Sequence, residues 1–392
     1  MPLAPVPLDM HVVVLGAGYA GLTLTRALES DLPPDVELTL VDESPDHLLQ
    51  HELHRVIRRP ELANELRVSL PDVLERATVR VARVEGIDRD ERVVSLSDGD
   101  LEYDLAAICL GARPAEYGLE GVAEHGLPLK RLPHARRIRS RALEVVRTDG
   151  GRIVVGGAGL SGVQVAGELA ALAAEEYGTA SVTLLEQADR VAPRFPSAFQ
   201  RTLEDALTDA GVEVRTGTAV VGADESAVHL ESGVELGTDA FVWTGGIQGP
   251  EAFDGDRPVV GADLRLDAHT FALGDAARVV DADGTAVPPS AQAAVAEART
   301  AAENVGRLVA AERDGRDEDG FEPRLESFTV DAPAWVVSVG DDAVAQIGPT
   351  VLTGRAAKTL KTGVGVGYLS SVGAVGNVAG RVARGVSSGW SR

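Results

Sequence analysis

Two glycine fingerprints of the form G-x-G-x-x-G constrain this chain more than any other feature of its sequence. The first, "GAGYAG", begins at Gly16, and the second, "GAGLSG", begins at Gly157, 141 residues later. Each fingerprint follows a run of β-branched residues and precedes an apolar stretch with helical character. Glycines at such a turn let the backbone approach a pyrophosphate, which the helix N-terminus then attracts. The repeat therefore predicts two βαβ units, each of which binds one dinucleotide.

An acidic residue stands at the predicted end of the strand that follows each fingerprint. Asp42 ends "VELTLVD", and Glu186 follows "SVTLL". An acid at this place binds a ribose 2′-OH, whereas NADPH sites tend to offer arginine. Arg190 lies close to Glu186, so NADPH stays an alternative to NADH at the second site. Two dinucleotides in one chain favour hydride transfer between a nicotinamide and a flavin.

The composition excludes several other classes of function. The 392 residues carry a formal net charge of -23, which argues against nucleic acid as a partner. Only three lysines occur among many acids, as in salt-adapted proteins, so we expect a halophilic source. The single cysteine, Cys109, excludes an intramolecular disulfide and a redox-active dithiol. Neither a secretory signal nor a membrane-spanning stretch is predicted.

The segment "FALGDAA" indicates which fingerprint binds which cofactor. With it, the chain resembles the two-dinucleotide-binding-domain flavoproteins, whose "GD" aspartate lies on the flavin ribityl chain; here it is Asp275. "ICLGARP", with Gly111, and "VWTGGIQGP", with Gly245, match further segments of that family. The resemblance covers roughly residues 9–330. It implies FAD at the first fingerprint and NADH at the second.

We therefore expect an α/β fold with two Rossmann-like domains and a C-terminal amphipathic segment. The predicted boundaries are 9–117 for the first part of the FAD domain, 118–249 for the NADH domain, 250–332 for the second part of the FAD domain and 333–392 for a membrane-docking segment. Residues 118–135, rich in glycine and proline, fit a hinge between the domains.

Within this family the chain is most similar to the type II NADH dehydrogenases, which pass electrons from NADH through FAD to a quinone. "PPSAQAA" resembles their A-Q-x-A-x-Q motif near flavin and quinone, with Gln292 as the first glutamine and Ala296 replacing the second. Gln164 replaces a frequent glutamate of the NADH helix, and Glu168 lies one turn further on. Disulfide reductases and sulfide:quinone reductases need reactive cysteines, so they are disfavoured. A soluble reductase of ferredoxin or another acceptor stays the alternative.

The fingerprints and the resemblance together predict the site residues. Gln292 and Glu168 are the candidate catalytic residues. FAD contacts are expected at Gly16, Gly18, Tyr19, Ala20, Gly21, Asp42, Val84, Gly111, Gly274, Asp275 and Ala291, and NADH contacts at Gly157, Gly159, Leu160, Gly162, Glu186 and Gly245.

Three histidines, His47, His51 and His54, are spaced to share one face of a predicted helix. Such a face could hold a metal, but the resemblance puts this segment beside the flavin and quinone pocket. We therefore expect a pocket wall or a packing role, with plain surface as the other alternative, and no metal.

The C-terminal residues carry no acidic side chain after Asp342 and six basic ones. In a helix, Leu352, Ala356, Leu360, Val364 and Tyr368 would form an apolar face beside a basic one made by Arg355, Lys358 and Lys361. The stretch "VGAVGNVAGRVARGV" repeats this pattern. Such a helix favours the surface of an anionic membrane, and the alternative is docking on the chain itself or on a partner subunit. We expect a peripheral protein on the cytoplasmic side of the cell membrane, with menaquinone as acceptor and a possible homodimer.

Overall fold

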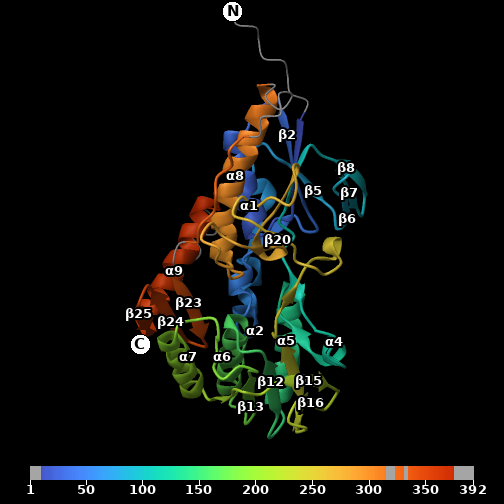
Figure 1. Cartoon of the computed structure of the whole chain (residues 1–392). Coiled ribbons are helices and arrows are strands. Elements are labelled where there is room, and N and C mark those ends of the chain that lie inside the picture. The colour runs from blue at the N-terminus through green and yellow to red at the C-terminus, as the bar shows by residue number, and fades with distance from the viewer. Residues whose placement is uncertain (1–9, 315–322, 331–333, 375–392) are drawn as a thin grey trace, which may run out of the picture.

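The computed structural model describes residues 10–314, 323–330 and 334–374. Two α/β bodies lie end to end, and a small C-terminal sheet with a helix runs along their side (Figure 1). This arrangement confirms the α/β class and the two Rossmann-like domains that the fingerprints predict.

The first body is built on a five-stranded parallel sheet with the order β21-β9-β1-β2-β5. Its strands alternate little in polarity because both faces are covered, and Val12 to Leu15 of β1 are all buried. The helices α1 and α8 pack against each other, and the meander β6-β7-β8 lies on the opposite side in Figure 1. The bounds are β1 (Met10–Leu15), α1 (Tyr19–Asp31), β2 (Val36–Asp42), β5 (Thr78–Val81), β6 (Val84–Asp88), β7 (Val93–Leu96), β8 (Gly99–Glu102), β9 (Leu105–Ile108), β21 (Thr270–Ala272) and α8 (Ala291–Arg313).

The second body repeats this plan with a parallel sheet of order β11-β18-β12-β13-β14. A three-stranded antiparallel sheet, β15-β16-β17, is attached to it. The bounds are α4 (Val122–His125), β11 (Leu127–Pro128), α5 (Leu132–Val146), β12 (Arg152–Gly156), α6 (Leu160–Glu175), β13 (Ser181–Leu185), α7 (Ser197–Asp209), β14 (Val212–Arg215), β15 (Val220–Ala223), β16 (Ala227–Leu230), β17 (Glu235–Gly237) and β18 (Ala240–Trp243).

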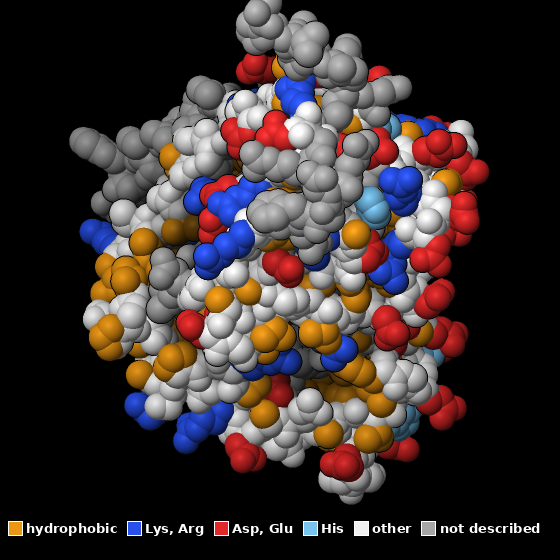
Figure 2. Space-filling model, turned by 45° about the horizontal axis from the view of Figure 1, so that its top comes forward, with side chains coloured by type: hydrophobic (Ala, Val, Ile, Leu, Met, Phe, Trp, Pro, Cys, Tyr) orange, Lys and Arg blue, Asp and Glu red, His pale blue; other side chains and the backbone are white. Residues whose placement is uncertain are grey.

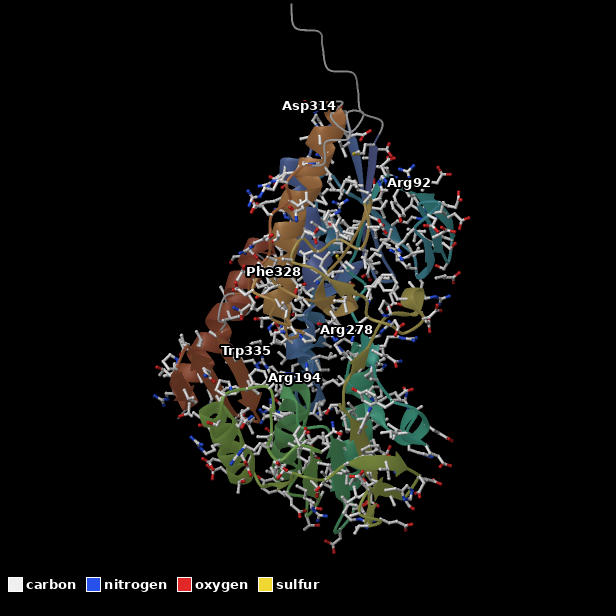
Figure 3. The ribbon with its side chains drawn as sticks, viewed as in Figure 1. Arg92, Arg194, Arg278, Asp314, Phe328 and Trp335 are labelled. Carbon is white, nitrogen blue, oxygen red and sulfur yellow. The ribbon has the colours of Figure 1, made fainter. Side chains whose placement is uncertain are left out.

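The C-terminal part contains a sheet that the sequence analysis does not anticipate. The antiparallel strands β23 (Trp335–Val339), β24 (Asp342–Ile347) and β25 (Thr350–Thr353) precede α9 (Gly354–Ser371). This sheet packs against α6 and α7, so closely that a Cβ atom on Gly167 of α6 would lie 2.5 Å from the Gly340 nitrogen. The ring of Trp335 (Figure 3) meets Phe195 edge-on at 5.0 Å. The C-terminal part is therefore tightly joined to the second body.

Short elements complete the described chain and correct one expectation. The helix predicted to carry His47, His51 and His54 does not form as one element, because Pro60 and a series of tight turns divide residues 46–69 into β3, η1, α2, η2 and β4. The bounds are β3 (Asp46–Leu48), η1 (Gln50–Glu52), α2 (Arg55–Arg58), η2 (Pro60–Asn64), β4 (Arg67–Ser69), α3 (Leu70–Val73), β10 (Arg113–Pro114), β19 (Ile247–Gln248), η3 (Glu251–Phe253), β20 (Val259–Val260), η4 (Gly274–Ala276) and β22 (Arg278–Val279).

Acidic side chains gather along one edge of the face that Figure 2 shows, as the net charge of -23 leads one to expect. Among the residues described, no helix has both the length and the apolar composition required to cross a bilayer.

Candidate functional site

The first fingerprint forms a tight turn between β1 and α1. Each of its three positions requires glycine for a different reason. Gly16 has φ 98°, and a Cβ atom there would lie 2.5 Å from the Cys109 carbonyl oxygen. A Cβ on Gly21 would lie 1.7 Å from the Gly16 oxygen. Gly18, in contrast, faces open space, and no side chain caps the N-terminus of α1. The first and third glycines thus serve the fold, and the second leaves room for a phosphate.

The second fingerprint repeats this geometry between β12 and α6. Gly157 has φ 93° and closely approaches Gly245, while a Cβ on Gly162 would lie 1.8 Å from the Gly157 oxygen. Gly159 again faces open space, and no side chain caps α6 at its first residue, Leu160. The two cradles therefore each fit a dinucleotide pyrophosphate.

The acids at the strand ends also occupy matching places. One oxygen of Asp42 accepts a hydrogen bond from the Ala17 nitrogen at 2.6 Å, and one oxygen of Glu186 accepts from the Ala158 nitrogen at 2.8 Å. Burial raises the pKa of Asp42, although hydrogen bonds from the Ala17 and Ser44 backbones oppose this rise. Each carboxylate oxygen can accept a second hydrogen bond, so both acids can still bind a ribose hydroxyl.

One pocket of about 220 Å³ lies where the two bodies meet, and helices from both fingerprints line it. Tyr19 and Ala20 belong to α1, whereas Ser161 and Gln164 belong to α6. Seven predicted FAD contacts line the pocket: Gly18, Tyr19, Ala20, Gly111, Gly274, Asp275 and Ala291. Cys109 lies in its wall, almost completely buried, and burial raises the pKa of this thiol far above its ordinary value. The pocket is thus the place where two bound dinucleotides can meet.

The turn at Asp275 is held from three sides. Gly274, at φ 67°, donates its N–H to Glu297 Oε2 of α8 at 2.6 Å. Arg257 donates to the Asp275 carbonyl at 2.8 Å, and the Lys130 ammonium lies 3.7 Å from the Asp275 carboxylate. Burial raises the pKa of Glu297 to about 7, and the charge of Asp275 adds to this rise. These contacts fix the loop that carries the candidate ribityl ligand.

Comparison with known proteins agrees with this architecture. Residues 10–298 match the family model of the pyridine nucleotide-disulphide oxidoreductases. This chain belongs to that family. It is 27% identical to a type II NADH:quinone oxidoreductase of Staphylococcus aureus, over 93% of this chain and 96% of the relative.

Two solved structures share the fold over nearly the whole chain. NDH2 from Plasmodium falciparum, in complex with NADH, superposes with a TM-score of 0.81 at 14% identity and covers 98% of this chain and 99% of its own. The sulfide:quinone oxidoreductase of Aquifex aeolicus superposes with a TM-score of 0.77 at 20% identity and covers 94% of this chain and 92% of its own. At these identities the likeness establishes the fold.

Not every predicted site residue of this oxidoreductase lies at the pocket. Gln292 is exposed at the start of α8, next to the pocket residue Ala291. Glu168 is buried and paired with Arg58 at 2.8 Å. Val84 begins β6 and pairs with Leu96, outside the pocket wall. The catalytic roles of Gln292 and Glu168 and the FAD contact of Val84 stay predictions.

The three histidines lie close to the pocket but do not share a helical face. His47 belongs to β3, and its Nδ1 lies 2.8 Å from the Ala17 oxygen. His51 and His54 line the pocket, and His54 Nε2 lies 2.8 Å from the Ser338 hydroxyl. Within the described part of the chain, no group of acids, histidines and cysteine is arranged to hold a metal.

The basic face expected for the C-terminal helix is also not fully exposed. Lys361 turns inward, donates to the Ser338 hydroxyl at 2.8 Å and lies 3.6 Å from Glu52. Burial opposes ionisation of Glu52, but the charges of Lys361 and its cationic neighbours hold the pKa of Glu52 well below its usual range. The expected apolar face is likewise divided, because Tyr368 packs against Tyr19 at 4.9 Å while Val364 is exposed. The expected repeat of this pattern beyond Ala374 lies outside the described residues.

Sequence reasoning missed Lys130, Lys361, Glu52 and Glu297 as residues around the site. One signal for the two lysines was available, since lysine is scarce throughout the chain and two of its three copies are placed here. The two glutamates gave no such signal, because the chain contains many acids.

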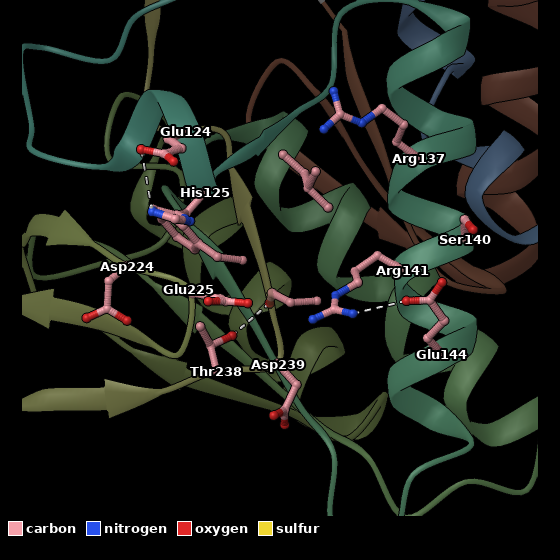
Figure 4. Close-up of a pocket in the computed structure, with 13 residues that line it drawn as sticks. Glu124, His125, Arg137, Ser140, Arg141, Glu144, Asp224, Glu225, Thr238 and Asp239 are labelled. Atoms are coloured by element: carbon pink, nitrogen blue, oxygen red, sulfur yellow. Dashed lines mark hydrogen bonds and ion pairs between the residues drawn. The ribbon is translucent and has the colours of Figure 1, made fainter.

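A second hollow lies at the start of β18, and its lining includes none of the fingerprint glycines (Figure 4). Its wall carries two arginines of α5 and several acids, and Arg141 donates to Glu144 at 3.0 Å. Asp239 and Ala240 stand at the N-terminal end of the strand, whereas α/β sheets bind their ligands at the carboxyl ends. We assign no function to this hollow.

Proposed function

We propose that this chain is a type II NADH:quinone oxidoreductase that uses FAD. The observation that carries the proposal is the pocket lined both by Gly18 and Asp275 and by Ser161 and Gln164 of the second fingerprint helix. FAD, when bound, accepts two electrons from NADH as a hydride and passes them to a quinone. The protein's part is to bind, to orient and to exclude water.

The residues of the first body would hold FAD. The open cradle at Gly18 takes the pyrophosphate, Asp42 takes a ribose hydroxyl and Asp275 takes the ribityl chain. The apolar side chains of Leu48, Leu129, Ala291 and Ala294 form a wall that excludes water from the pocket.

The residues of the second body would hold NADH. The cradle at Gly159 takes the pyrophosphate and Glu186 takes a ribose hydroxyl, which favours NADH over NADPH. Gln164 lies in the pocket and accepts a hydrogen bond from Ser338 at 3.5 Å, so it is available to orient the nicotinamide or the quinone. Gln292, beside Ala291, is the candidate for the junction of flavin and quinone.

The acceptor decides between this function and a soluble ferredoxin-type reductase. NADH should bleach the flavin absorbance of the purified holoenzyme, and a soluble menaquinone analogue should restore it, whereas ferredoxin should not. Restoration by ferredoxin alone would reject the quinone function, and a flavin that NADH does not bleach would reject the oxidoreductase.

We also propose that the protein docks on the cytoplasmic side of the membrane through its C-terminal segment. Arg355 and Lys358 are exposed on α9, and six basic residues follow Asp342 without any acid. Lys361 and Tyr368 build α9 into the fold, so the deletion that tests docking should begin after Ala374. Loss of 375–392 combined with Arg355→Ser and Lys358→Ser should release the enzyme from anionic liposomes in a flotation assay, and unchanged flotation of this variant would reject this docking mode. The expected homodimer is tested by light scattering of the full chain.

A further inference from the structure

A chain of hydrogen bonds joins the C-terminal helix to the first fingerprint. The Tyr368 hydroxyl of α9 lies 3.1 Å from His47 Nε2, and His47 Nδ1 lies 2.8 Å from the carbonyl oxygen of Ala17. Ala17 stands between Gly16 and Gly18 of the fingerprint. Residues separated by 321 positions in the sequence thus reach the phosphate-binding turn together.

The chemistry of the groups determines which atom donates in each of these two hydrogen bonds. A carbonyl oxygen can only accept, so His47 must carry its proton on Nδ1 and accept at Nε2. The Tyr368 hydroxyl is then the donor to His47. Burial lowers the pKa of His47 to about 4, so the imidazole is neutral over the physiological range and keeps this tautomer.

The hydrogen bond to Ala17 orients the peptide group between Ala17 and Gly18, at the cradle where the phosphate would bind. Because a peptide unit is planar and trans, the Ala17 carbonyl and the Gly18 N–H point in opposite directions. When His47 holds the carbonyl, it also fixes the direction of the Gly18 N–H. The Ala17 N–H is held in turn by Asp42 at 2.6 Å. Both peptide groups of Ala17 are therefore fixed before a ligand arrives.

Aromatic packing strengthens the same connection. Tyr19, the first residue of α1, lies 5.1 Å from the His47 ring and 4.9 Å from the Tyr368 ring, measured between centroids. Tyr19 also lines the pocket. The docking surface of α9 thus includes the first residue of the phosphate-binding helix.

We propose that Tyr368 and His47 are positioning residues that couple the packing of α9 against the first body to the binding of FAD. Docking of α9 denotes this packing within the protein. The coupling rests on the proposed assignment of FAD to the first fingerprint. Because coupling between two events is reciprocal, FAD must stabilise docked α9 by the factor with which docked α9 strengthens FAD binding. Elsewhere α9 is anchored by Lys361 and by the buried Leu369, so loss of one hydroxyl weakens the coupling without releasing the helix.

The test uses full-length protein freed of flavin and titrated with FAD, with binding followed by quenching of flavin fluorescence. Tyr368→Phe removes one hydroxyl and should weaken FAD binding about fivefold, the usual effect of one hydrogen bond. Backbone hydrogen exchange of residues 354–371 should slow on FAD addition in the wild type and respond less in this variant. Tyr177→Phe, at a tyrosine that is 94% exposed, is the matched control and should leave both measurements unchanged.

A second pair of variants tests the role of His47. His47→Gln keeps a donor for Ala17 and an acceptor for Tyr368, so it should retain most of the FAD affinity, whereas His47→Leu should lose as much as Tyr368→Phe or more. Wild-type affinity in Tyr368→Phe, or exchange in α9 that ignores FAD, would overturn the coupling. Failure of the wild type to bind FAD would overturn the proposed function itself, and the coupling with it.

Discussion

Arg58 of α2 donates through Nε to Glu168 of α6 at 2.8 Å, and less than a tenth of either side chain is exposed to solvent. The same guanidinium lies 3.3 Å from Glu175 and 2.6 Å from Asp341 in the loop between β23 and β24. One side chain of α2 thus contacts both α6, the helix of the second fingerprint, and the loop of the C-terminal sheet.

Replacing Arg58 should therefore destabilise the protein strongly. Arg58→Gln leaves Glu168 buried without its cation, and such losses cost about 3–5 kcal/mol of unfolding free energy. The neighbouring Arg59 is partly exposed and pairs with Glu175, so Arg59→Gln should cost no more than about 1 kcal/mol. Urea unfolding measures both, and equal costs for the two variants would show that burial of the Arg58 pair contributes little.

Glu168 itself was predicted as a catalytic residue, and its partner allows a sharper test. If the role of Glu168 is only to pair with Arg58, Glu168→Gln should lower the unfolding free energy. The rate of flavin reduction by NADH should then stay within about twofold of the wild-type rate. A loss of about a hundredfold in that rate, at unchanged stability, would support catalysis instead. Stopped-flow absorbance of the flavin gives the rate.

The glycines of one fingerprint should respond differently to the same substitution. Gly18→Ala should fold, because its Cβ meets nothing within 4 Å, yet it should weaken FAD binding by at least about tenfold by filling the phosphate cradle. Gly21→Ala should prevent stable folding, because its Cβ would overlap the Gly16 oxygen. Circular dichroism and flavin content of the purified variants separate the two effects. A flavin-loaded Gly18→Ala protein with normal affinity would reject the cradle.

Glu186 should set both the affinity for NADH and the preference over NADPH. Glu186→Gln removes the charge that a ribose hydroxyl would meet, so the KM for NADH should rise about tenfold and that for NADPH should change less. Glu213→Gln, on the neighbouring strand β14, is the matched control, because Glu213 is exposed and pairs with the partly exposed Arg215. Steady-state kinetics with NADH and with NADPH measure both KM values. An unchanged ratio of the two would count against a contact between Glu186 and the ribose.

Glu297 should make stability fall as the pH rises. Burial raises its folded pKa to about 7 from an ordinary value of 4.5, so the folded state binds its proton more tightly than the unfolded state. The contribution of protonated Glu297 to the unfolding free energy is complete below the pKa of the unfolded state. It is lost as the pH rises through the pKa of the folded state, by at most about 1.4 kcal/mol per pH unit. The unfolding free energy of the apoprotein, compared with that of Glu297→Gln, should decline between about pH 5 and about pH 7 and then level off. Glu303→Gln, exposed on the same helix, should show no such difference.

The sequence predicted those parts of the site that depend on local geometry. Gly21 and Gly162 are each required by a carbonyl oxygen five residues earlier, and the strand before each fingerprint and the helix after it follow from short-range patterns. Gly16 and Gly157 are needed partly for a positive φ, which is local, and partly because the distant residues Cys109 and Gly245 approach them closely. Asp42 and Glu186 could be found because a parallel strand places its last residue beside the turn.

Contacts between distant segments could not be predicted in this way. Periodicity shows which residues share a face of α9, but not that Lys361 on that helix would be buried against Glu52, more than three hundred residues earlier. The same limit applies to Arg58 and Glu168, which are 110 residues apart. The strands β23 to β25 could not be predicted from periodicity, because each has at most six residues and a short apolar run fits a strand and a helix equally well.

The burial of Cys109 has a practical consequence. The chain has one thiol, its exposed fraction is 4%, and the raised pKa of that thiol keeps it protonated and unreactive. A cysteine introduced on the exposed side of α9, for example at Thr362, would therefore react alone with a maleimide fluorophore or a spin label. This single substitution would make α9 accessible to spectroscopy, on liposomes and during turnover, without removal of the native cysteine.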